Sequence, residues 1–285
     1  MVRRILIATS ALALAFAQNA QQITGQWTVG PLVQDKIQLS IQRTMGAGSH
    51  MSNSSPIALT QLNGLTRGQL ESAGAVVRFE LVRDAGTLRF EGYTKNGGGG
   101  GAFTFSPNPK FESEMRSLGF SGLTDEKVFT MAMHDVSAAY VREMNALGIR
   151  PDSTDQLITM RIHGVTAEYA GAFKSMGYAA SDLTPDKLVT MRIHGVTPEF
   201  ARELKSLGYG SVSPDQMVTM RIHDASTDFI KEVVALGYNH PSIDQLVTMR
   251  IHGVTPEFIR KTRSQGLGNL SIDQLVSVKI HGILD

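Results

Sequence analysis

One six-residue segment recurs along most of this chain, and its spacing limits the possible folds. Thr-Met-Arg-Ile-His-Gly occupies residues 159–164, 190–195 and 248–253, and degenerate copies occupy 130–135, 219–224 and 277–282. The histidines of the six copies are separated by 29, 31, 29, 29 and 29 residues. A period of that length fits one helical hairpin and is too short for a globular domain. It therefore predicts a stacked repeat array rather than an enzyme active site.

The unit at residues 196–224 illustrates the fold expected of each repeat. Thr197 is a good N-cap, Pro198 suits the first helical position, and Gly208 supplies the left-handed residue that ends the helix. Ser213 and Gln216 have the spacing of a capping box for a second helix. The same pair recurs at Ser153/Gln156, Ser242/Gln245 and Ser271/Gln274. Both helices are too short to persist alone, so their stability must come from packing against neighbouring repeats.

The second helix of this unit carries Met217, Val218, Met220 and Ile222. Methionine recurs at one position of the repeat, as Met131, Met160, Met191, Met220 and Met249. A thioether also suits an adaptable binding surface, but a methionine at helical spacing beside Ile and Val favours core packing.

The region from about Gly25 to Pro107 has a period of two instead, which predicts strands. Tight reversals are expected at Asp84-Ala85-Gly86 and at Asn96-Gly97. Loops are expected between Thr44 and Pro56, where Gly, Ser and Asn are frequent, and at Gly97–Gly101. We expect an α+β chain: a small antiparallel β domain at residues 18–109, then an α-solenoid of αα-hairpin repeats at residues 110–285. A sandwich with Trp27 in or near its core is the suggested form of the β domain.

The first 17 residues have the pattern of a secretory signal peptide. Arg3 and Arg4 precede an apolar run from Ile5 to Phe16, and Ala15-Phe16-Ala17 suits cleavage. The run is too short for a membrane anchor, and no other stretch approaches the length of a transmembrane segment. We expect an exported protein, periplasmic or secreted, without a transmembrane segment in the mature chain.

Composition argues against cysteine-based chemistry and against nucleic-acid binding. The chain contains no cysteine, which excludes a disulfide framework and thiolate chemistry. Residues 18–109 hold seven Lys/Arg against five Asp/Glu, and residues 110–285 hold eighteen against twenty-one. A nucleic-acid-binding array is expected to carry a strong positive excess, so nucleic acid is not an expected partner.

The repeated histidines are His134, His163, His194, His223, His252 and His281. Each lies in the last turn of a predicted helix, where imidazole interacts favourably with the helix dipole and with unpaired carbonyls. One histidine per repeat does not bring three or four ligands to one metal, because stacked helices lie about 8 to 10 Å apart. We interpret these residues as structural caps, with a pH-responsive role and a metal site as alternatives, and we expect no cofactor.

A second repeated position is cationic: Arg161, Arg192, Arg221, Arg250 and Lys279. A cation near a helix C-terminus has a local explanation in the helix dipole. A row of cations on one face of an array is also a candidate binding surface for an anionic partner. Four aspartates at a matching height of the repeat are candidates to neutralise it: Asp155, Asp215, Asp244 and Asp273.

Catalytic motifs are missing from the sequence. It has no His-Glu-x-x-His segment, no Gly-x-Ser-x-Gly segment, and no paired carboxylates apart from the repeat pattern. The glycines at 97–101 precede a predicted strand rather than a Gly-Lys-Ser/Thr and a helix, so they do not form a phosphate-binding loop. We expect no enzymatic activity, and we name no catalytic residue.

The segment Asp-Gln-Leu-Val-Thr-Met-Arg-Ile-His-Gly-Val-Thr-Pro-Glu-Phe at 244–258 resembles helical repeats of exported bacterial proteins. Similar repeats occur in the periplasmic tails of some membrane metallopeptidases of the beta-lactam-sensor type. The resemblance covers about Lys110 to Gly282, and residues 78–105 look like a β domain that accompanies such repeats. It implies an extracytoplasmic accessory or sensing module. The peptidase domain is missing here, so none of that catalysis carries over.

These observations favour an exported, non-catalytic interaction or scaffold module. It uses a solenoid surface to bind a protein or cell-envelope partner, and we expect a monomer. One alternative is a ligand-responsive sensor accessory that binds an anionic envelope fragment along the cationic positions. Another is a metal-dependent enzyme that uses the histidines.

Overall fold

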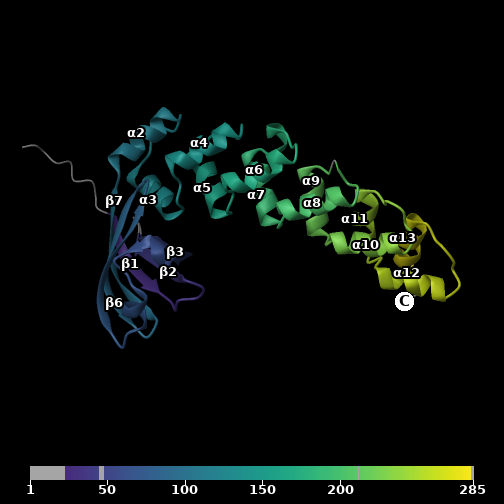
Figure 1. Cartoon of the computed structure of the whole chain (residues 1–285), viewed down its shortest axis with the longest axis horizontal. Helices are drawn as coiled ribbons and strands as arrows, with labels where there is room; N and C mark the ends of the chain where they lie inside the picture. Colours follow the sequence, from purple (N-terminus) through teal and green to yellow (C-terminus); the bar gives the residue numbers. More distant parts are fainter. Residues whose placement is uncertain (1–22, 45–47, 211, 284–285) are drawn as a thin grey trace, which may run out of the picture. The chain divides into compact units, whose positions relative to one another are not determined.

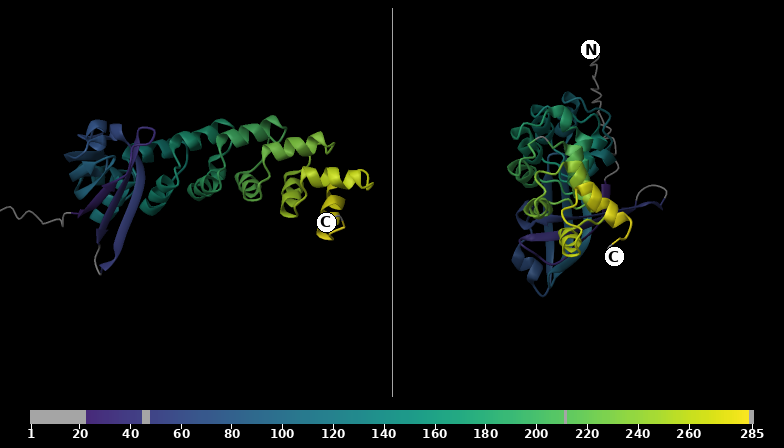
Figure 2. Two further views of the ribbon diagram at one scale, coloured as in Figure 1. Left: turned by 90° about the horizontal axis from the view of Figure 1, so that it is seen from below. Right: turned by 90° about the vertical axis from the view of Figure 1, so that its right-hand side faces the viewer.

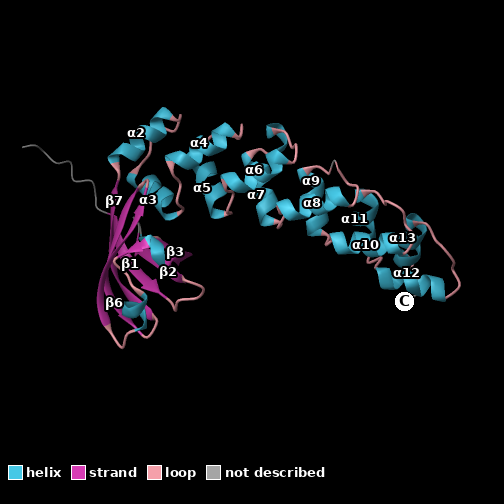
Figure 3. Cartoon of the chain, viewed as in Figure 1, coloured by secondary structure: helices cyan, strands magenta, loops and turns pink. Residues whose placement is uncertain are grey.

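The computed structural model describes residues 23–44, 48–210 and 212–283 of the 285-residue chain. The predicted signal peptide at residues 1–17 lies outside the described residues. The described part is α+β, as expected, with an N-terminal antiparallel sheet followed by helices (Figures 1 and 3). The chain divides into two compact units. Of the described residues, one unit holds those up to Val82 together with Thr87–Pro107, and the other holds Arg83–Gly86 together with those from Asn108 onward.

The first unit contains seven strands, one short α-helix, α1 (Arg67–Glu71), and one 3-10 helix (Leu59–Gln61) among its described residues. The strands are β1 (Ile23–Val29), β2 (Lys36–Thr44), β3 (His50–Ala58), β4 (Leu62–Asn63), β5 (Ala75–Arg83), β6 (Gly86–Lys95) and β7 (Gly98–Pro107). They form a single sheet in the order β3-β2-β1-β7-β6-β5-β4, so the suggested two-sheet sandwich is wrong. Alternate side chains point into one core, as the period of two requires.

Trp27 lies in this core, as expected, and is only 1% exposed. Its ring meets Phe79 edge-on at 5.0 Å between centroids, and Phe79 stacks on Phe90 at 4.6 Å. The indole Nε1–H donates to the carbonyl of Glu91 at 3.1 Å, so the polar edge of the ring is satisfied.

Both predicted reversals are present, since β5 ends at Arg83 before β6 begins at Gly86, and β6 ends at Lys95 before β7 begins at Gly98. Two predicted loops are wrong. Most of the Ser/Asn-rich stretch is strand β3, which pairs along β2 from Lys36 to Thr44 as the polar outermost strand of the sheet. Gly98–Gly101 belongs to β7, whose glycines from Gly99 on pair with β1.

Close backbone contact explains why glycine occupies that strand. If Gly101 carried a Cβ atom, that atom would lie 2.0 Å from the carbonyl oxygen of Glu91. A Cβ atom at Gly92 would lie 2.2 Å from the carbonyl oxygen of Gly100. Neither Gly101 nor Gly92 has room for a side chain, so glycine at these two positions is required by packing rather than by loop flexibility.

The second unit contains twelve α-helices of nine residues each within the described part. One row of helices is α2 (Pro109–Ser117), α4 (Ala138–Ala146), α6 (Ala167–Ser175), α8 (Pro198–Ser206), α10 (Thr227–Ala235) and α12 (Pro256–Ser264). The other is α3 (Asp125–Met133), α5 (Thr154–Ile162), α7 (Pro185–Ile193), α9 (Pro214–Ile222), α11 (Ile243–Ile251) and α13 (Ile272–Ile280).

Helices of the same row contact each other in sequence order. Contacts join α2 to α4, α4 to α6, and so on to α12, and they join α5 to α7, α7 to α9, α9 to α11 and α11 to α13. The left view of Figure 2 shows these two rows. Each hairpin therefore packs mainly against the hairpins before and after it.

The caps lie where the sequence predicts them. Thr197 caps α8 and Ser213 caps α9, and the side chain of each accepts a hydrogen bond from the backbone three residues later. The complete capping box forms at Ser213, Ser242 and Ser271. At Ser153 the cap is present, but the side-chain oxygen of Gln156 accepts from the Asp152 N–H instead.

The methionine positions are in the core, as expected, because all five residues from Met131 to Met249 are fully buried. The apolar face of the second helix does not continue to its last residue, however. Ile222, two residues after Met220, is 53% exposed.

Candidate functional site

The repeated histidines lie at helix C-termini. Each is the C-cap residue of its helix, from His134 after α3 to His281 after α13. The Nδ1 atom of His281 lies 2.7 Å from the carbonyl oxygen of Ser277, one of the last carbonyls of α13. No group of three or more His, Cys, Asp or Glu side chains in the described part is arranged to hold a metal ion.

Each repeated cation stands over an aromatic ring of the preceding even-numbered helix. The distance from the cationic centre to the ring centroid is 5.1 Å for Arg161 over Tyr140 and 4.8 Å for Arg192 over Tyr169. It is 5.2 Å for Arg221 over Phe200, 5.2 Å for Arg250 over Phe229 and 5.1 Å for Lys279 over Phe258. These are cation–π contacts, and each joins the two helices of one hairpin.

The guanidinium groups also donate to the histidine caps one repeat earlier. Arg161 Nε donates to the His134 carbonyl at 3.2 Å, and Arg192 Nε donates to the His163 carbonyl at 3.2 Å. Arg250 Nε donates to the His223 carbonyl at 3.4 Å. A cation at the negative end of a helix dipole is stabilising, so these arginines have a structural role.

The repeated cations differ in their ion pairs, because two of the arginines have a carboxylate partner from the preceding repeat. Arg161 Nη2 lies 2.9 Å from Asp135, and Arg250 Nη2 pairs with Asp224. These are the two positions where Asp replaces the usual glycine after the histidine, and both aspartates have positive φ. The replacement therefore supplies a counter-ion as well as a helix end.

Arg192 and Arg221 instead face Gly164 and Gly195. A Cβ atom added to Gly164 would lie 2.8 Å from Arg192 Nη2, and one added to Gly195 would lie 3.4 Å from Arg221 Nη2. Neither arginine has a carboxylate within ion-pair distance in the part of the chain that the structure describes. Two adjacent repeats thus present ring-supported cations without a counter-ion.

Two of the aspartates suggested as partners of the arginines have other partners. Asp155 pairs with Lys127, and Asp215 lies 2.9 Å from Lys187 Nζ. Both lysines occupy the place of the capping-box glutamine in their own helices. They reach instead to the start of the next helix in the row, and Gln156 does the same through a 2.8 Å bond to Asp186.

Tyrosine hydroxyls provide a set of contacts that the sequence analysis missed. Tyr140 donates to the Val165 carbonyl and Tyr169 to the Val196 carbonyl, each at 2.8 Å. A second set follows the glycine at the end of the first helix: Tyr178 to Val212 at 2.9 Å, Tyr209 to Pro241 at 2.7 Å and Tyr238 to Leu270 at 2.8 Å. The recurring Gly-Tyr pair is the signal that could have revealed the second set.

Burial dominates the altered acidities in this region. It raises the pKa of Tyr140 to about 12, although the nearby Arg161 acts in the opposite direction. Burial also lowers the pKa of His134, and the positive charge of Arg161 lowers it further. Both shifts arise mainly from burial among the packed helices of the second unit.

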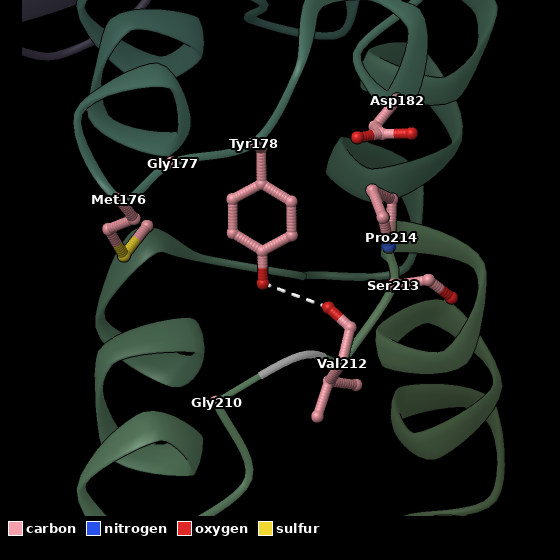
Figure 4. Close-up of a pocket in the computed structure, with 8 residues that line it drawn as sticks. All are labelled: Met176, Gly177, Tyr178, Asp182, Gly210, Val212, Ser213 and Pro214. Atoms are coloured by element: carbon pink, nitrogen blue, oxygen red, sulfur yellow. Dashed lines mark hydrogen bonds between the residues drawn. The ribbon is translucent and has the colours of Figure 1, made fainter.

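One pocket of about 290 Å³ lies between the loops that follow α6 and α8 (Figure 4). Three of its polar groups are engaged in structural hydrogen bonds. Asp182 accepts from the Ala179 N–H, Ser213 accepts from the Gln216 N–H, and the Tyr178 hydroxyl donates to the Val212 carbonyl. The pocket is therefore part of the contact between hairpins.

No family model matches the chain, and no curated protein matches it. Within the described residues, no helix combines the length and apolar character needed to cross a bilayer.

Proposed function

We propose that this chain is a non-catalytic, exported interaction module. In this proposal α2–α13 form an α-solenoid that presents one surface to a protein or cell-envelope partner. The observation that carries the proposal is the repeated stack of a cation on an aromatic ring, which is fixed in the same way in five successive hairpins. Equivalent groups held at a regular spacing suit recognition of an extended partner.

The experiment that tests this function is affinity capture. The immobilised chain, residues 18–285, is exposed to a bacterial envelope extract, and any retained protein is then titrated against the purified chain by calorimetry. The proposal predicts one saturable partner whose binding weakens when exposed residues of α2–α13 are substituted. Retention of no partner, together with turnover of a substrate by the purified chain, contradicts it.

Export is tested separately. The N-terminal pattern predicts that a C-terminally tagged chain, produced in a bacterium, leaves the cytoplasm with a mass that matches residues 18–285. Arg3→Glu/Arg4→Glu should slow that processing, because a signal peptide requires a positively charged N-terminal region. Full-length protein that stays in the cytoplasm contradicts this part of the proposal.

A second candidate function is binding of an anionic envelope fragment. It is favoured by Arg192 and Arg221, which lie in adjacent repeats and lack the carboxylate partner that Arg161 and Arg250 have. Both arginines are exposed residues, and their guanidinium groups rest on the rings of Tyr169 and Phe200. They therefore suit bidentate contacts to carboxylate or phosphate groups.

The chain supplies a matched control for this candidate. Binding of a muropeptide with free carboxylates should weaken at least ~10-fold in Arg192→Gln/Arg221→Gln and should depend on salt. The pair Arg161→Gln/Arg250→Gln should have little effect. Gly164→Asp/Gly195→Asp copies the arrangement of the flanking repeats and should also abolish binding. Equal losses in the two arginine pairs contradict this candidate.

A further inference from the structure

The last residue of five helices in one row is an exposed isoleucine. These residues end α5, α7, α9, α11 and α13, and their side chains are 53% to 57% exposed: Ile162, Ile193, Ile222, Ile251 and Ile280. The corresponding residue of α3 is Met133, which is buried. The isoleucine of the repeated Thr-Met-Arg-Ile-His-Gly segment is thus an outward-facing residue in all five helices that have it.

These isoleucines form a stripe, because each helix contacts the next helix of its row. The residue four positions earlier lies on the same helix face and is Val or Ile in every case. It is Ile158, Val189, Val218, Val247 or Val276, all buried just below the surface. Single exposed isoleucines are ordinary. A row of five presents a few hundred Å² of apolar surface, a size that marks interaction sites.

We propose that a second copy of this chain covers the isoleucine stripe, with the two stripes antiparallel about a two-fold axis. A partner that repeats at the same spacing can engage all five isoleucines at once. A second copy meets this condition by construction. Isologous pairing also lets the same residues serve on both sides.

The surface area of the isoleucine stripe is close to the area that each partner buries in a protein dimer. A standard interface buries about 800 Å² per partner, of which somewhat more than half is apolar. Five half-exposed isoleucines with the neighbouring histidine and threonine side chains supply an area of that order. The two-fold axis places Ile222, the middle member, against its own copy. It places Ile193 against Ile251 and Ile162 against Ile280.

Sedimentation velocity over a range of concentrations tests the dimer. The exported chain should dimerise reversibly, and Ile193→Ser/Ile222→Ser/Ile251→Ser should raise the dimer Kd at least ~100-fold. The matched control replaces three exposed valines outside the stripe, as Val76→Ser/Val82→Ser/Val234→Ser, and should leave the Kd unchanged. Circular dichroism establishes that each variant is folded, and a triple Ile→Val variant should still dimerise.

The register is tested by cross-linking, since the chain has no cysteine of its own. Ile222→Cys should form a disulfide-linked dimer on mild oxidation, and Val234→Cys should not. Ile193→Cys mixed with Ile251→Cys should cross-link faster than either variant alone. A monomer at all concentrations, equal dimerisation of the serine triple, or binding of the stripe to lipid vesicles instead overturns the proposal. The dimer and the captured partner are separate readouts, so either proposal can fail without the other.

Discussion

Met220 and Ile222 are close in sequence on the same helix, yet substitution by alanine should affect stability very differently. Met220 is fully buried, whereas Ile222 is 53% exposed. Met220→Ala removes a buried side chain and leaves a cavity between hairpins, so it should lower the free energy of unfolding by about 3 kcal/mol. Ile222→Ala gives up little buried area and gains helix propensity, so its effect should stay within about 0.5 kcal/mol.

Urea denaturation followed by circular dichroism measures this difference. With an m value of about 3 kcal/mol/M, Met220→Ala should lower the unfolding midpoint by about 1 M. Hydrogen exchange should then show faster opening of α9 and of its neighbours α7 and α11, since these helices are in contact. Both measurements use protein concentrations below the dimer Kd. A loss at Ile222→Ala equal to that at Met220→Ala would refute this assignment of buried and exposed positions.

Three further predictions concern a tyrosine hydrogen bond, a helix cap and a histidine of the second unit. Tyr209→Phe leaves the Pro241 carbonyl without its donor and should cost about 1 to 2 kcal/mol in urea denaturation. Ser213→Ala removes the cap of α9 and should cost about 1 kcal/mol by the same assay. The pKa of His134 is lower in the folded state, so its contribution to stability is fully present above the unfolded pKa near 6.5 and is lost as the pH falls through the folded pKa. His134→Gln should therefore flatten the dependence of stability on pH between 7 and 5, and an unchanged slope contradicts this reading.

Local signals explain why most helices of the second unit could be predicted. Thr197, Ser213 and the other caps act within a few residues of themselves, so their effect can be read directly from the sequence. The same holds for the turns at Asp84-Ala85-Gly86 and Asn96-Gly97. The histidine positions at helix ends follow from the same short-range pattern.

The missed features depend on residues distant in sequence. Most side chains of strand β3 are exposed or half-buried, and the strand is defined by its pairing with β2. Gly101 of β7 is required by the backbone of β6. Composition alone gives both segments the character of loops. The pairing of Asp135 with Arg161 and of Tyr209 with Pro241 depends on how successive hairpins align. The exposure of Ile222 depends on the same alignment, because helical periodicity does not say which apolar residues a neighbour covers.

The most direct test of the proposed solenoid is deletion of one repeat. Removing residues 196–224 joins Gly195 to Ala225, which restores the repeat pattern at the junction. If each hairpin packs only on its neighbours, the shortened chain should fold with the same helical ellipticity per helical residue and should unfold cooperatively in urea. An unfolded product, or one that loses the ellipticity of the remaining hairpins, would show that the helices share a single core and would contradict the proposal.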